Sequence, residues 1–92
     1  MARYRRRDQQ EYSVADRLEA GGRRYAVELI AKKATGVEGY RLTLSYLETD
    51  GPDSAFVQLD PADTRDEVED RARELSADPD RLRRLLAEQR GG

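Results

Sequence analysis

The spacing of the apolar residues changes once along this chain, and that change restricts the fold more than any other feature. In residues 40–46, Tyr, Leu, Leu and Tyr alternate with Arg, Thr and Ser. A two-residue period is typical of a β-strand with one buried face. After residue 64 the period becomes helical, with Val68, Ala72 and Leu75 at positions i, i+4 and i+7. We therefore expect a sheet first and helices after it.

Turn residues divide the alternating part into four segments. Gly21 and Gly22 tolerate the positive φ angles of a tight hairpin, and residues 35–39 and 50–53 are typical of turns. The predicted strands span about residues 11–20, 23–34, 40–47 and 55–59.

Two helix starts follow the strands. Thr64 and Glu67 fit a capping box, and Asp78 before Pro79 fits an N-cap followed by the first helical residue. The helices are predicted at about residues 64–77 and 79–90, the second with Leu82, Leu85 and Leu86 on its apolar side. The predicted fold is α+β: a four-stranded antiparallel β-meander followed by two short helices packed on one face of the sheet.

The chain has 92 residues, which is enough for one domain, predicted at 11–92. Residues 1–10 are Arg-rich and without periodicity, so we predict a mobile arm. No apolar stretch follows the basic residues 3–7, and no apolar run is long enough to span a bilayer. A cytoplasmic location is therefore expected. Fifteen of the 17 basic residues are Arg, a bias that indicates a GC-rich bacterial genome.

The chain contains no Cys and no His. It therefore lacks thiolate nucleophiles, zinc–thiolate sites, the commonest general base and the commonest transition-metal ligand. None of the serines at positions 13, 45, 54 and 76 has a His to activate it. We predict a protein without enzymatic activity, cofactor or metal. A pair of carboxylates acting as acid and base stays open, because spatial pairing is invisible in a sequence.

The strand period also predicts which side chains share a face. The tyrosines at positions 12, 25, 40 and 46 have the same parity as the apolar residues and are expected in the core. The opposite face is mixed, with a small apolar centre at Ala26, Ile30 and Phe56. We interpret these three residues as a candidate interface for a homodimer or another protein partner. An ordinary solvated sheet face is the alternative.

A basic set of residues supports a second hypothesis, in which the protein is an accessory factor that binds single-stranded nucleic acid. Its candidate contacts are Arg3, Arg5, Arg6, Arg7, Arg24, Lys32 and Arg41. No family is recognised, but the order of four strands and then a helix resembles small domains that dimerise and bind single-stranded nucleic acid. Glu11, Glu19 and Glu28 on the same face would repel phosphate.

The first helix carries an acidic stripe at Asp66, Asp70 and Glu74. A third hypothesis is therefore an inhibitor or mimic that binds a basic protein through this stripe. The alternative is a solvated helix face with Glu67–Arg71 and Glu69–Arg73 ion pairs at i, i+4. Taken together, the sequence favours a non-enzymatic binding or accessory module that acts through protein–protein contacts.

Overall fold

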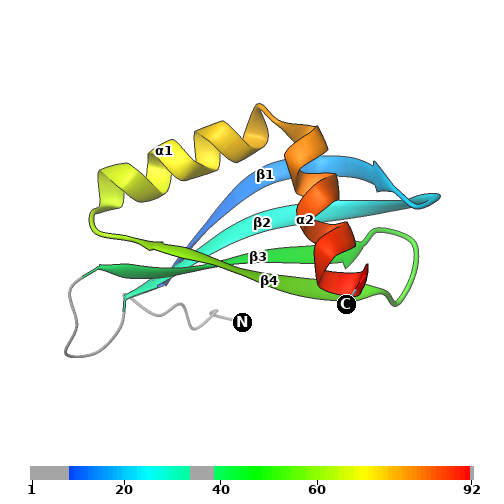
Figure 1. The fold of residues 1–92 in the computed structure, drawn as a ribbon, viewed down its shortest axis with the longest axis horizontal. Helices are drawn as coiled ribbons and strands as arrows, with labels where there is room; N and C mark the ends of the chain where they lie inside the picture. Colours follow the sequence, from blue (N-terminus) through cyan, green and yellow to red (C-terminus); the bar gives the residue numbers. More distant parts are fainter. Residues whose placement is uncertain (1–8, 34–38, 92) are drawn as a thin grey trace, which may run out of the picture.

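The computed structural model describes residues 9–33 and 39–91, which form four strands and then two helices (Figure 1). The strands are β1 (Gln9–Ala20), β2 (Arg23–Lys33), β3 (Tyr40–Glu48) and β4 (Ser54–Ala62), and the helices are α1 (Arg65–Ser76) and α2 (Pro79–Gly91). The sheet is antiparallel with the order β1-β2-β3-β4, so the predicted meander is confirmed. β1 begins two residues before its predicted start, and β4 ends three residues after its predicted end.

Gly21 and Gly22 form the β1–β2 turn with φ angles of 60° and 80°. Two consecutive residues with positive φ match the twist of a hairpin, which is why a Gly-Gly pair is suited to this position. The arm was predicted at residues 1–10, but Gln9 and Gln10 belong to β1. Residues 1–8 and most of the second predicted turn lie outside the described residues.

Strand β1 departs from strict alternation because its register with β2 shifts twice, between Ser13 and Ala15 and between Ala15 and Leu18. These irregularities act as β-bulges, which insert extra residues into one strand. They leave Asp16 exposed and return Leu18 to the core, where it is 2% exposed. The bulges therefore explain why Asp16 is out of step with the apolar pattern.

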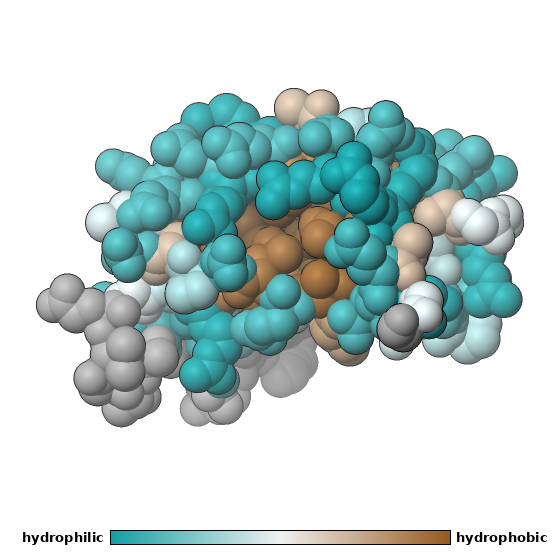
Figure 2. All heavy atoms as spheres, in the orientation of Figure 1, coloured by the Kyte–Doolittle hydropathy of each residue, from teal (hydrophilic) through white to brown (hydrophobic). Residues whose placement is uncertain are grey.

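Both helices lie on the same side of the sheet, and the core fills the space between the two layers (Figure 1). Figure 2 shows apolar residues gathered in the middle of the molecule, with hydrophilic residues around them. The predicted helix positions Val68, Ala72 and Leu75 are buried. In α2, Leu82 and Leu86 are buried and Leu85 is only partly buried. No helix in the described part of the chain is long and apolar enough to cross a membrane.

The tyrosines have the predicted parity. Tyr25 and Tyr46 are buried in the core with their rings edge to face, 6.3 Å between centroids. Tyr12 and Tyr40 are partly buried and pack against the same core. The tyrosines are therefore part of the packing between the layers and are not a stacking surface for nucleobases.

Side-chain caps begin both helices, as predicted. The Thr64 hydroxyl accepts a hydrogen bond from the Glu67 backbone N–H at 3.2 Å. The Asp78 carboxylate accepts one from the Arg81 N–H, also at 3.2 Å. Each cap satisfies a backbone donor that has no partner within the helix.

The predicted i, i+4 ion pairs of α1 are wrong. Arg71 donates to the backbone oxygens of Asp60 and Pro61, at 2.8 and 3.3 Å, and Arg73 pairs with Asp70 at 3.1 Å. Asp60 and Pro61 lie close to the end of the edge strand β4, where carbonyl groups keep unoccupied lone pairs. These carbonyls are fixed in position by the strand, whereas the exposed Glu67 side chain would lose conformational freedom by forming an ion pair.

Candidate functional site

The helices α1 and α2 cover one face of the sheet, and the face opposite them is called here the open face (Figure 1). The strand register fixes the rows of side chains that cross it. One row places Ala26 beside Leu47, and the next places Ser45 between Glu28 and Phe56. Residues that are direct neighbours across antiparallel strands have Cβ atoms about 5 Å apart, so each row is a set of contacting side chains.

Two large apolar side chains are half exposed on this face: Phe56 at 55% and Leu47 at 50%. Within residues 9–33 and 39–91 they are the only large hydrophobic residues with this degree of exposure. Leu47 was not among the predicted interface residues. The alternation in β3 was the available signal, since residues 41, 43 and 45 face outward and residue 47 continues the series.

Leu47 joins two of the predicted residues into one surface. It pairs directly with Ala26 on β2, and Phe56 on β4 is its diagonal neighbour, because Leu47 pairs with Ser54. Diagonal neighbours in a sheet are about 7–8 Å apart, within reach of an aromatic ring. We call Ala26, Leu47 and Phe56 the outer apolar patch. Ile30 is partly buried and lies apart from the patch, since Glu28 separates it from Ala26 along β2.

Ser45 is only 5% exposed although it belongs to the open face. Its small side chain lies between the longer side chains of Glu28 and Phe56, its direct neighbours in the sheet. Large groups beside small ones make the patch uneven, with the Phe56 ring raised above the level of Ser45.

Charged residues lie around the patch but do not form a basic surface. Lys32 and Arg41 are direct neighbours at one end of the open face. Arg24 lies at the other end, 3.7 Å from the Glu19 carboxylate. Arg24 and Lys32 are eight residues apart on β2, which corresponds to about 27 Å. Of the predicted nucleic-acid contacts that the structure describes, Lys32 and Arg41 are therefore brought together and Arg24 is not. Arg3, Arg5, Arg6 and Arg7 lie outside the described residues.

The acidic stripe on α1 is exposed at all three positions, Asp66, Asp70 and Glu74. Asp70 is engaged by Arg73. In the part of the chain that the structure describes, no three acidic side chains come close enough together to hold a metal ion. The stripe is thus a row of separate carboxylates on a solvated helix.

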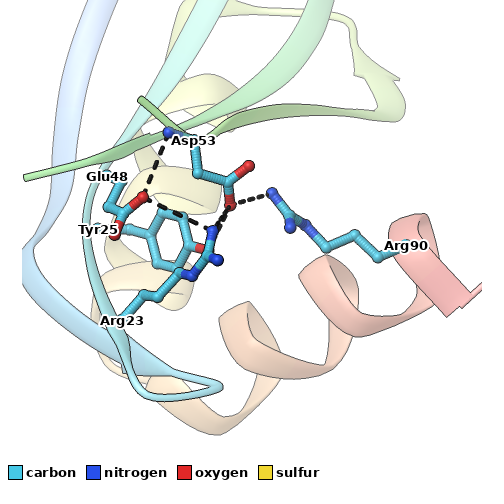
Figure 3. A network of polar contacts seen from close by, with 5 residues as sticks. All are labelled: Arg23, Tyr25, Glu48, Asp53 and Arg90. Atoms are coloured by element: carbon cyan, nitrogen blue, oxygen red, sulfur yellow. Dashed lines mark hydrogen bonds and ion pairs between the residues drawn. The ribbon is translucent and has the colours of Figure 1, made fainter. Parts of the chain in front are cut away.

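A polar network joins β2 and the β3–β4 turn to α2 (Figure 3). Its centre is Asp53 in the β3–β4 turn, whose Oδ2 atom accepts a hydrogen bond from the Tyr25 hydroxyl at 2.7 Å and another from Arg90. Arg23 Nη1 lies 3.4 Å from the same oxygen and 3.7 Å from Glu48 Oε1. Glu48 also accepts a bond from the Asp53 backbone N–H at 3.2 Å.

The network shifts two titrations in opposite directions. The hydrogen bond from Tyr25, together with Arg90, holds the pKa of Asp53 below its ordinary value, since both favour the carboxylate. The same hydrogen bond, with burial, raises the pKa of Tyr25. Both shifts move the pKa values of these two groups further from pH 7. The arrangement therefore does not supply an acid or base that exchanges protons near pH 7, and it serves to hold α2 against the sheet.

Sequence reasoning missed this network because its members are distant along the chain. Tyr25 and Asp53 are separated by 28 positions, and Asp53 and Arg90 by 37. No local pattern marks such a group.

No protein-family model matches the chain, and no curated protein or solved structure matches it either, so its function is inferred from these surfaces.

Proposed function

We propose that this protein is a non-enzymatic binding module that self-associates through the open face of its sheet. One observation supports the proposal: Leu47 and Phe56 are half exposed side by side on a face that neither α1 nor α2 covers. Burying such side chains stabilises a contact by about 1.5–3 kcal/mol per fully buried residue. Aromatic residues at the centre of a contact surface commonly dominate its energy.

The dimensions of the open face suit a second copy of the chain. Four strands about 4.8 Å apart and nine residues at about 3.3 Å each give a flat outline of roughly 19 × 30 Å, or roughly 570 Å². A standard interface buries about 800 Å² of accessible surface per partner. Because side-chain relief adds accessible area to the flat outline, face-to-face packing of two copies approaches the standard size. We expect a dimer with a dissociation constant in the micromolar range.

The charges on the open face are compatible with this partner. Among the residues that the register pairs on the open face, Glu11, Glu19 and Glu28 are equal in number to Arg24, Lys32 and Arg41, so these paired residues carry no net charge. Two copies are therefore not driven apart when they approach. A nucleic-acid partner has less support, because phosphate binding depends on an excess of positive charge.

The solution mass of the wild type, measured by light scattering over a range of concentrations, tests the proposal. The wild type should approach twice its monomer mass of 10.5 kDa. Leu47→Asp and Phe56→Asp should remain monomeric at the concentration at which the wild type is dimeric, because each places a charge in the patch. Gln89→Asp adds the same charge to an exposed position of α2 and is the matched control, which should dimerise like the wild type.

Two results would overturn the proposal. One is a wild-type protein that remains monomeric up to millimolar concentration. The other is a dimer that persists in both Asp variants, since this would place the contact elsewhere on the molecule. Circular dichroism shows whether each variant is folded. A monomer mass measured for a folded variant is then assigned to the disrupted interface.

A further inference from the structure

A cavity of about 350 Å³ lies on the helical side of the molecule, between α2 and the β1–β2 hairpin. The helix contributes Arg83, Leu86, Ala87 and Arg90, which share one side because they follow the i, i+3, i+4, i+7 spacing. Small-molecule sites have volumes of about 300–1,000 Å³ and mostly apolar walls with a few polar groups. This cavity is at the lower end of that range.

Two arginines that line the cavity form hydrogen bonds across it, from α2 to other elements. Arg83 Nε donates to the Glu19 backbone oxygen at 2.7 Å, and Arg90 donates to Asp53. These residues are about two turns apart on α2, and each one crosses from the helix to the sheet. Leu86 and Ala87 lie between the two bridges and form an apolar wall.

Arg23 lines the cavity from β2 and retains donor capacity. Its side chain is 52% exposed, and its nearest carboxylate oxygens, on Asp53 and Glu48, are 3.4 and 3.7 Å away. It donates no hydrogen bond within residues 9–33 and 39–91. Figure 3 shows its guanidinium close to the Asp53 carboxylate, which Arg90 approaches from the helix. A guanidinium has five N–H donors in a planar fork that matches a carboxylate.

The local charge limits what this site can attract. Arg23, Arg83 and Arg90 are balanced by Glu48, Asp53 and Asp80, the last of which pairs with Arg83 at 2.7 Å. There is no surplus of positive charge to hold a dianion or a nucleic-acid backbone. Because the site is neutral overall, a monoanion gains only the local hydrogen bonds of the Arg23 N–H groups, and its apolar body adds contact with the cavity wall.

We propose that this cavity binds a small monocarboxylic acid with a short apolar chain or ring. The carboxylate is held by Arg23, and the apolar part lies against Leu86 and Ala87. The proposal does not depend on self-association, since the cavity is on the helical side and the outer apolar patch is on the open face. Its test can therefore fail or succeed separately from that of the dimer.

Titration of the ¹⁵N-labelled protein at pH 7 with hexanoate, 1-hexanol and inorganic phosphate tests the proposal. Hexanoate should shift the amide signals of residues 20–25 and 83–90 with a millimolar dissociation constant, the range expected for so small a ligand. 1-Hexanol has the same apolar chain without the charge and should bind at least fivefold more weakly. Phosphate should not shift these signals.

Variants locate the two halves of the site. Arg23→Gln should weaken hexanoate binding at least fivefold, whereas Arg24→Gln, the same change at the next residue on the open face, should leave it unchanged. Ala87→Leu should weaken hexanoate binding at least fivefold because the larger side chain occupies part of the space beside Leu86, and it decides the question if Arg23→Gln does not fold. Three results would overturn the proposal. One is the absence of any signal shift with 50 mM hexanoate, which is about ten times the expected dissociation constant. The others are hexanol binding as tightly as hexanoate and unchanged hexanoate binding in Ala87→Leu.

Discussion

Removing the Tyr46 hydroxyl should make this protein less stable at neutral pH and more stable at high pH. Tyr46 projects from β3 into the core, is fully buried, and donates a hydrogen bond to the Leu82 backbone oxygen at 2.8 Å. Burial raises the pKa of Tyr46 from 10.0 to about 12, because the phenolate is disfavoured away from water. Tyr46→Phe keeps the ring and removes both the hydrogen bond and the titration.

The two effects have opposite signs and different pH dependence. Loss of the hydrogen bond should cost about 1 kcal/mol in the free energy of unfolding at pH 8. The raised pKa means that the unfolded wild type ionises before the folded form does, so stability is present below pH 10 and is lost as the pH rises toward 12. One pKa unit corresponds to about 1.4 kcal/mol, so the full loss is about 2.7 kcal/mol. Tyr46→Phe has no phenol to ionise and does not lose this stability. The curves of unfolding free energy against pH for the two proteins should therefore cross at about pH 11.

Urea unfolding at pH 8 and at pH 11.5 measures the crossing. The wild type should exceed Tyr46→Phe by about 1 kcal/mol at pH 8 and fall below it by about 1 kcal/mol at pH 11.5. The raised pKa values of Tyr12 and Tyr25 affect both proteins equally and cancel from the difference. Tyr40→Phe, the other tyrosine of β3, is the matched control for a phenol that is only partly buried. A difference that is the same at both pH values would refute the reasoning.

Further predictions concern the Asp53 network and the turn before β3. Because the hydrogen bond from Tyr25 lowers the pKa of folded Asp53, its contribution to stability is present above about pH 3.8 and is lost as the pH falls through the folded value. Asp53→Asn should therefore lower the melting temperature at pH 7 and have a smaller effect at pH 3; an equal effect at both values would contradict the role of the charge. Gly39 has a φ of 102°, and a Cβ there would lie 2.9 Å from the Ala62 backbone oxygen. Gly39→Ala should cost about 1–3 kcal/mol in urea unfolding, and a change within error of the wild type would show that the turn relaxes freely.

The outer apolar patch was only partly predictable. Ala26 and Phe56 were expected on the outer face from strand parity, and the structure places both of them there. Leu47 completes the patch, and the same parity could have found it at the end of β3. The separation of Ile30 from the patch was not readable from parity, because parity gives the face of a residue and not its neighbours on the next strand. That information comes from the register.

The sequence by itself determined the order of the elements, the antiparallel meander and the inward direction of the tyrosines. These features follow from local periods, glycine turns and helix caps, which act over a few residues. The tertiary structure alone decided the β1 bulges, the partners of Arg71, the Asp53 network and the cavity beside α2. Each depends on where helices and strands from distant parts of the chain meet. The geometry that joins Tyr25, Asp53 and Arg90 exists only once the sheet has formed and α2 has packed on it.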